Sequence, residues 1–416
     1  MSVDNSELLM LLGGKKKIKQ TIGEAGQQGF GVGVYGDPED LTDMGLAPME
    51  GCKDPSSDNY GNYIHTNGSV MVFIPAFCYR IGNESAPSYY RDKENALEIR
   101  DASKGEGDGW ILHRAFIDGG KQKLGFFIDK YICSKDKTGA LAVSVKNGDN
   151  ISLSTDYVAS STMPNCRGQI ADAILLSRTR GEGFSLTTGF QWSAIAMLSL
   201  AHGQAATSSQ FCGWYDAKHE KNYPKGNNSW RKDCDDSSVT WTAHVAQPSI
   251  GKTGSGTPFV KTTHNGQACG VTDVNGSQWQ AILGFMNPSE KLYRVLKDNV
   301  KAHDITSGNI MDDSLYDLFS YSSNNDTSYY WGGSAFSKDK SGRNRALCGL
   351  MPYIFQSSGY NLFGRDCFHA HRDTYSVLLV GGSCIKETDA GVWARMGSSW
   401  VSDLWDVSFR VAGYAY

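Results

Sequence analysis

The stretch LLVGGSCIKETDAGVWARMGSSWVSDLWDVSFRVAGY, residues 378–414, decides the fold. It alternates apolar, β-branched and aromatic runs with Gly and Asp turn residues, a pattern typical of short strands joined by loops. Its Trp residues are expected to fill a core, since large aromatic side chains bury extensive apolar area. The closing run around Phe409 and Val411 predicts a strand that pairs back into a sheet.

Two further strand patterns precede this stretch, in SVMVFIPAFCYRIG (69–82) and KLGFFIDKYICSK (123–135). Residues 184–203 predict the clearest helix, with Thr188 as its N-cap and Gly203 at its end. A second, shorter helix is expected over residues 277–287. Strands near both ends that enclose one long helix and long loops predict an α+β fold whose terminal strands pair with one another.

Residues 1–66 differ from the rest of the 416-residue chain. They combine a short apolar start, a basic run, a Gly-rich stretch and a polar segment. We therefore expect an N-terminal attachment or connector segment at 1–66, followed by a single ligand-binding domain at 67–416.

Composition limits the classes of partner. Hydrophobic residues make up 40% of the chain, charged residues 20%, and the net charge is -4. Outside Lys15–Lys17 the basic residues are scattered, so neither nucleic acid nor membrane insertion is expected. The N-terminal apolar run is too short for a signal peptide, which favours synthesis in the cytoplasm. The ten widely spread cysteines are expected to be mostly buried, small apolar side chains.

Five short motifs follow one another along the chain. They comprise Met71 to Gly82; Phe127, Ile128, Asp129 and Tyr131; Leu186, Thr187, Trp192, Ala196 and Gly203; Asn265, Gly270, Val271, Asp273, Val274, Gly276 and Trp279; and Gly381, Gly382, Ser383, Phe409, Arg410 and Val411. Their order resembles the formylglycine-generating-enzyme and retroelement-diversified variable-protein branch of the C-type lectin fold. The resemblance implies a C-type-lectin-like α+β domain with long loop insertions, and it leaves residues 1–66 outside.

The oxidase members of this family use two cysteines spaced five apart after the Gly-Gly-Ser motif, because their copper chemistry needs a thiolate pair. In this chain Cys384 follows that motif, but Asp389 stands five residues further on. The resemblance therefore implies a binding protein rather than an enzyme, without catalytic residues and without a cofactor.

In the diversified members the C-terminal segment is variable and displays a ligand-binding face. The resemblance places that region at about residues 355–410. Diversification of adenines in Asn codons cannot produce Lys, Glu, Met or Trp. The candidate binding residues of the permitted types are Ile385, Asp389, Ser398, Val401, Asp403, Leu404 and Asp406.

An upstream stretch, residues 357–375, has a similar aromatic and polar character. It adds Tyr360, Phe363, Arg365, Phe368, His369 and His371 as residues that widen the face. An insertion loop that packs its own aromatic side chains is an equal alternative. Cys367, His369 and His371 also stand at alternate positions, but the sequence shows no fourth ligand nearby, and no metal site is assigned.

These features predict a phage or viral adhesin whose partner is a host-cell surface protein or glycan. The expected location is the virion, at a tail-fibre tip, or a prokaryotic cell surface. A homo-oligomer, such as a trimer, would add avidity to weak individual sites. A formylglycine-generating-type oxidase and a non-diversified carbohydrate-binding or structural virion protein are the alternatives.

Overall fold

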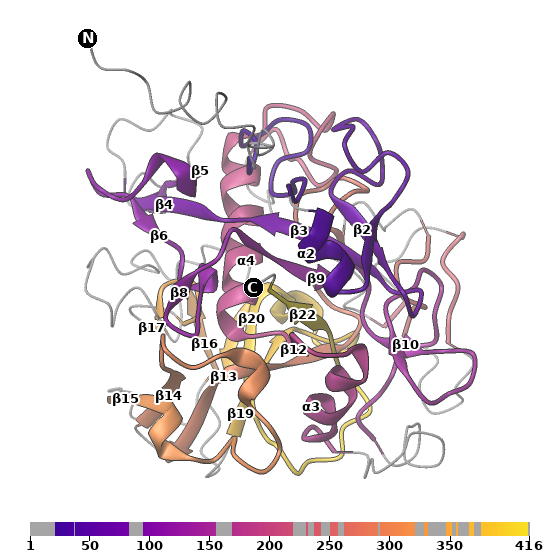
Figure 1. Cartoon of the computed structure of the whole chain (residues 1–416), viewed down its shortest axis with the longest axis vertical. Helices are drawn as coiled ribbons and strands as arrows, with labels where there is room; N and C mark the ends of the chain where they lie inside the picture. Colours follow the sequence, from indigo (N-terminus) through magenta and orange to yellow (C-terminus); the bar gives the residue numbers. More distant parts are fainter. Residues whose placement is uncertain are drawn as a thin grey trace.

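The computed structural model describes residues 21–36, 38–82, 95–154, 169–218, 230–231, 237–242, 250–256, 262–289, 292–320, 328–331, 347–351, 355–356, 366–369 and 376–414. This part of the chain is mostly β-sheet with few α-helices, grouped around one long central helix (Figure 1). The α-helices are α2 (Pro38–Asp43), α3 (Asp172–Ser177) and α4 (Gly189–Ala205).

A six-stranded sheet has the order β1-β2-β3-β9-β22-β12. Its strands are β1 (Leu46–Pro48), β2 (Asn62–His65), β3 (Val70–Pro75), β9 (Gly125–Asp129), β22 (Val411–Gly413) and β12 (Phe184–Leu186). The late strand β22 lies between β9 and β12, where Ala412 is opposite Ile128 and Val411 is opposite Leu186. The expected pairing between early and late strands is confirmed.

A nine-stranded sheet has the order β15-β14-β13-β19-β20-β18-β16-β17, with β21 paired to β13. Its strands are β13 (Trp279–Ser289), β14 (Leu292–Leu296), β15 (Tyr316–Ser320), β16 (Ser328–Trp331), β17 (Phe355–Gln356), β18 (Cys367–His369), β19 (Ser376–Gly381), β20 (Gly391–Ser399) and β21 (Val407–Phe409). The C-terminal segment therefore contributes to both large sheets.

Smaller sheets and 3₁₀ turns complete the described architecture. The remaining strands are β4 (Phe77–Ile81), β5 (Leu97–Asp101), β6 (Ile111–Leu112), β7 (Ile117–Asp118), β8 (Lys121–Gln122), β10 (Ser134–Lys135) and β11 (Ala142–Val143). The 3₁₀ turns are η2 (Ala102–Lys104), η3 (Arg114–Phe116), η4 (Arg178–Arg180), η5 (Ala302–Asp304), η6 (Asp313–Leu315) and η7 (Glu387–Asp389).

Helix α4 begins as its sequence predicts. The Thr188 hydroxyl accepts from the backbone N–H of Gln191, and the Gln191 side chain accepts from the backbone N–H of Thr188, which forms a capping box. Every residue from Gly189 to Gly203 is buried. A helix that is apolar on nearly all sides is typical of a core element covered by sheet and loops.

The expected short helix at residues 277–287 is wrong, because most of this segment is strand β13. Strand β13 pairs with β14, β19 and β21, and Trp279 is opposite Val407 in the parallel ladder. A short apolar run fits a buried helix or a buried strand, and here the neighbouring strands decide. By contrast, the strands expected near residues 70–81, 125–129 and 376–413 are confirmed.

The expected boundary at residue 66 does not separate two cores. Strand β2 ends at His65 and pairs directly with β3, so that Tyr63 is opposite Met71. Phe30, Val32 and Tyr63 belong to the same buried cluster as the later strands. Residues 21–66, apart from residue 37, therefore form part of the main body, and residues 1–20 lie outside the described residues.

Three buried histidines predict that the protein loses stability in mild acid. Burial lowers the pKa of His113 and His264 to about 3 and that of His202 to about 4. Each ring accepts a backbone N–H bond, which suits the neutral form. Below pH about 6.5 the unfolded chain binds protons that these folded rings do not, so this stability is complete above that pH and is lost toward pH 4.

We expect the free energy of unfolding to fall by about 1.4 kcal/mol per pH unit for each histidine across this window. Urea denaturation from pH 8 to pH 4 measures the slope. The variant His303→Gln, which changes a partly exposed histidine, should leave the slope unchanged. A flat profile between pH 7 and pH 5 would contradict the assignment.

Candidate binding surface

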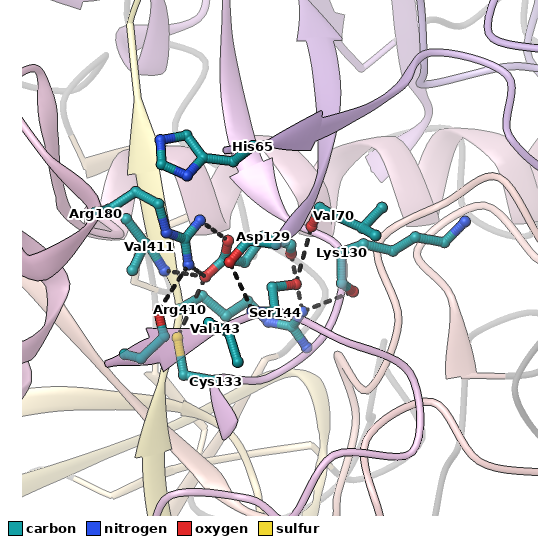
Figure 2. A network of polar contacts seen from close by, with 12 residues as sticks. His65, Val70, Asp129, Lys130, Cys133, Val143, Ser144, Arg180, Arg410 and Val411 are labelled. Atoms are coloured by element: carbon teal, nitrogen blue, oxygen red, sulfur yellow. Dashed lines mark hydrogen bonds and ion pairs between the residues drawn. The ribbon is translucent and has the colours of Figure 1, made fainter. Parts of the chain in front are cut away.

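A fully buried ion pair lies beneath the C-terminal segment. Arg180 at the end of η4 donates to the two carboxylate oxygens of Asp129 at 2.7 Å and 3.2 Å, and both side chains have no exposed area. The same carboxylate accepts from the Val411 backbone N–H at 2.9 Å and from the Cys133 thiol at 3.2 Å (Figure 2). These additional donors offset the cost of removing the two charges from water.

Arg410 lies beside this ion pair and connects the closing strands to three other segments. Its guanidinium donates to the carbonyls of Asp129 and Lys130 at 3.0 Å and 2.9 Å (Figure 2) and to the Gln280 amide oxygen at 2.6 Å. It also donates to the Thr272 carbonyl. Burial lowers the pKa of Arg410 to about 10, so it remains charged at neutral pH. These hydrogen bonds fix the segment between β20 and β22 to the buried residues around Asp129.

The loop between β20 and β21 is held at its backbone. The carbonyls of Trp400 and Ser402 accept from the backbone N–H groups of Ala171 and Ile170 at 2.9 Å and 3.2 Å. The Leu404 N–H donates to the carbonyl of Leu153 at 3.0 Å. Hydrogen bonds from both sides therefore fix a loop in which the side chains of Val401 and Asp403 are exposed.

The start of β20 is irregular. Val380 is opposite Arg395, yet the next residue, Gly381, is opposite Gly391, so three residues of β20 bulge out of the ladder. The Asp366 carboxylate accepts from the Trp393 N–H at 2.9 Å inside this bulge. A Cβ at Gly391 would lie 2.0 Å from that carboxylate, so only glycine permits the contact. The turn η7 directly precedes this bulge.

The predicted binding residues fall into three groups by exposure. Val401 is 55% exposed and Asp403 is also exposed, while Ile385, Asp389, Leu404 and His369 are partly buried. Tyr360, Phe363, Arg365 and His371 lie outside the described residues. The exposed candidates lie in the loop after β20, whereas Ile385 lies shortly before η7 and Asp389 is the last residue of η7.

Three of the predicted binding residues are buried in this structure. Phe368 is 1% exposed, Ser398 is 7% exposed and Asp406 is 8% exposed. Phe368 and Ser398 are buried because both lie within paired strands of the nine-stranded sheet. The backbone carbonyl of Asp406 accepts from the Trp279 N–H at 2.7 Å, which places Asp406 at the start of the parallel ladder with β13.

Cys367, His369 and Asp389 form a compact polar cluster beside β20. One potential ligand atom from each residue lies within 4.8 Å of the others. Burial raises the pKa of the Cys367 thiol, and the carboxylates of Asp389 and Asp366 raise it further. Asp389 was considered from the sequence only as a binding residue, because nothing in the chain order indicates that η7 reaches β18.

The cysteines confirm one sequence expectation. All eight cysteines of the described residues are buried and free, including Cys384 after the Gly-Gly-Ser turn. The Cys384 backbone N–H donates to the Ser277 carbonyl at 2.9 Å. Buried thiols mostly act as small apolar groups, although Cys133 donates to Asp129 and Cys367 lies beside His369 and Asp389.

Sequence analysis missed Arg180 as the partner of Asp129. The motif match includes Asp129 and treats it as scaffold, and an aspartate within an apolar strand indicates that a buried cation must lie near it. That indication does not say which of the many arginines supplies the charge.

Comparisons with known proteins give a weak likeness to solved structures. No protein-family model and no curated protein matches the chain. The structures titled "Major Tropism Determinant U1 Variant" and "Major Tropism Determinant I1 Variant" are each 11% identical, with TM-scores of 0.31 and 0.30. In both cases the match covers 83% of this chain and 63% of the other, so the chain spans less than two thirds of their length.

A third solved structure, "Structure of PvdO from Pseudomonas aeruginosa", is 10% identical with a TM-score of 0.24. The match covers 84% of this chain and 95% of that chain. At these TM-scores the likeness carries no argument about function. Among the described helices, none is long and apolar enough to cross a membrane.

The buried ion pair predicts a large asymmetry between two aspartate variants. Asp129→Ala leaves the Arg180 guanidinium buried without its countercharge, so we expect a loss of about 3–5 kcal/mol in unfolding free energy. Asp149→Ala removes a 56%-exposed partner of Lys252 and should cost no more than about 1 kcal/mol. Urea denaturation of both variants measures the difference, and equal losses would contradict the role given to Asp129.

Proposed function

We propose that this chain is a receptor-binding adhesin of a phage or virus, built on a C-type-lectin-like domain that presents its C-terminal segment as a diversified surface. Its partner is a protein or glycan of the host-cell surface. The chain works at the tip of a tail fibre, and a homotrimer there multiplies weak individual contacts.

The mutual contacts of the five sequence motifs support the lectin-like assignment. Met71 of the first motif is opposite Asp129 of the second in the sheet. Thr187 of the third donates through its hydroxyl to the Arg410 carbonyl at 3.1 Å. Arg410 of the last motif donates to Gln280, next to Trp279 of the fourth. Motifs that are far apart in the chain therefore form one core, as a shared scaffold requires.

The anchored loop between β20 and β21 is the observation that carries the binding proposal. Val401 exposes 55% of its surface and Asp403 is exposed, while the backbone on both sides is hydrogen-bonded to Ile170 and Ala171, just before α3, and to Leu153. A loop already held in place loses little conformational entropy when a ligand binds. The Val401 side chain is 55% exposed, so its chemistry can differ without disturbing the core.

The proposal includes a binding role without catalysis. The family resemblance requires a second thiol five residues after Cys384, and Asp389 occupies that position. The Cys384 side chain has no exposed area. We expect the purified protein, supplied with copper and a cysteine-containing peptide, to form no aldehyde product by mass spectrometry; formation of that product would favour the oxidase alternative.

The binding surface is tested by changing Val401 to Asp. We expect Val401→Asp to reduce adsorption of the fluorescently labelled protein to a panel of bacterial cells by at least about 10-fold, because a charge replaces an apolar contact. The melting temperature should stay within about 2 °C, since the site is exposed. Flow cytometry and thermal unfolding measure the two quantities.

Leu318→Asp is the matched control, because Leu318 on β15 is 54% exposed and lies outside the proposed surface. It should adsorb like the unchanged protein. Equal adsorption by both variants, or equal loss in both, would reject the loop as the binding surface. Absence of adsorption by the unchanged protein to every strain would count against the adhesin proposal itself.

Diversification is tested in the flanking DNA. We expect a near-repeat of the region that encodes residues 355–410, with adenines at the codons of Ile385, Val401 and Asp403, beside a reverse transcriptase gene. Absence of both would remove diversification and leave a non-diversified carbohydrate-binding or structural virion protein.

A further inference from the structure

Strand β18 presents two metal-ligating side chains in alternate positions. Cys367 and His369 are two residues apart on a paired strand, so both project from the same face, while Phe368 points to the other. Cys367 is fully buried and His369 is partly buried. Cys367 therefore lies in the interior, and His369 lies closer to the surface.

The turn η7 supplies a third side chain. Asp389 is its last residue and lies just before the irregular start of β20, the strand that pairs with β18 further along. The Cys367 sulfur, a His369 ring nitrogen and an Asp389 carboxylate oxygen then lie within 4.8 Å of one another. Side chains from two separate segments converge on one point.

We propose that Cys367, His369 and Asp389 bind one divalent transition-metal ion of the zinc class, with a fourth coordination position left for water or an external ligand. Sulfur, imidazole nitrogen and carboxylate oxygen are the three ligand types that zinc accepts. Calcium and magnesium bind oxygen ligands and do not favour a thiolate.

The charges suit a dication. A deprotonated Cys367 and the Asp389 carboxylate supply two negative charges, which balance the ion in a partly buried site. Ligand atoms around a tetrahedral zinc ion lie roughly 3–4 Å apart, so small side-chain rotations close the present spacing.

Bound metal would connect η7 to β18 and thereby fix the segment that carries Ile385 and Asp389. Because His369 and Asp389 are only partly buried, the open coordination position faces the accessible side. The site depends on these three residues alone and is independent of the proposed receptor binding at Val401.

The test uses the full chain, stripped with a chelator and kept reduced, and Co²⁺ as a spectroscopic probe. We expect one Co²⁺ per chain, with a thiolate-to-cobalt charge-transfer band and the intense visible bands of tetrahedral coordination, both lost when Zn²⁺ is added. Zn²⁺ should also raise the melting temperature, because it binds the folded state.

Single variants assign the ligands. Cys367→Ala should lose the charge-transfer band, while His369→Gln and Asp389→Asn, which change partly exposed residues, should each weaken Co²⁺ binding by at least about 10-fold. Cys348→Ala and His303→Gln are controls, a buried cysteine and a partly exposed histidine outside the cluster, and should bind normally.

Three outcomes would overturn the site. They are failure of the unchanged protein to bind Co²⁺ or Zn²⁺, a charge-transfer band that survives in Cys367→Ala, and unchanged affinity in both His369→Gln and Asp389→Asn. The last two variants keep the test decisive if Cys367→Ala does not fold.

Discussion

The ion pair between Asp129 and Arg180 is the constraint on which this structure depends. Two opposite charges with no exposed area are tolerated because they pair with each other and the surrounding chain adds hydrogen bonds to the carboxylate. The Asp129 carboxylate binds the Val411 N–H, and Arg410 holds the carbonyls beside it. One electrostatic centre, and not apolar contact alone, therefore positions strand β9, turn η4 and the last two strands, β21 and β22. It gives the core a specific register.

In this arrangement, the groups that hold the loop in place differ from the groups that would contact a ligand. The loop between β20 and β21 is held through its carbonyl and N–H groups, which every residue type except proline provides. The start of β20 is different, since the Asp366 carboxylate occupies the space that a side chain at Gly391 would need. Val401, by contrast, touches solvent and is open to change. A surface of this kind can vary in chemistry while its backbone stays in place.

Local patterns in the sequence predicted most of the elements, but they did not indicate which side chains meet in the core. The Thr188 cap and the apolar run at β3 depend on neighbouring residues, so both are visible in the chain. Strand β13 was mistaken for a helix because its apolar run fits either structure until flanking strands select one. Arg180 lies 51 positions from Asp129, and Asp389 meets Cys367 only through a bulge. Contacts of this kind arise only in the folded chain, so neighbouring residues in the sequence do not reveal them.

The position of β22 has a consequence for how the chain folds. Val411 and Asp129 are 282 positions apart, yet β22 lies between β9 and β12 inside the six-stranded sheet. While the ribosome is still making the intervening residues, β9 can pair with β3 but lacks its second neighbour, β22. The Asp129 carboxylate likewise lacks the Val411 N–H as a donor. Contacts of such long sequence separation slow folding and leave unpaired strand edges exposed meanwhile. Assembly of this core must therefore wait until β22 has been synthesised.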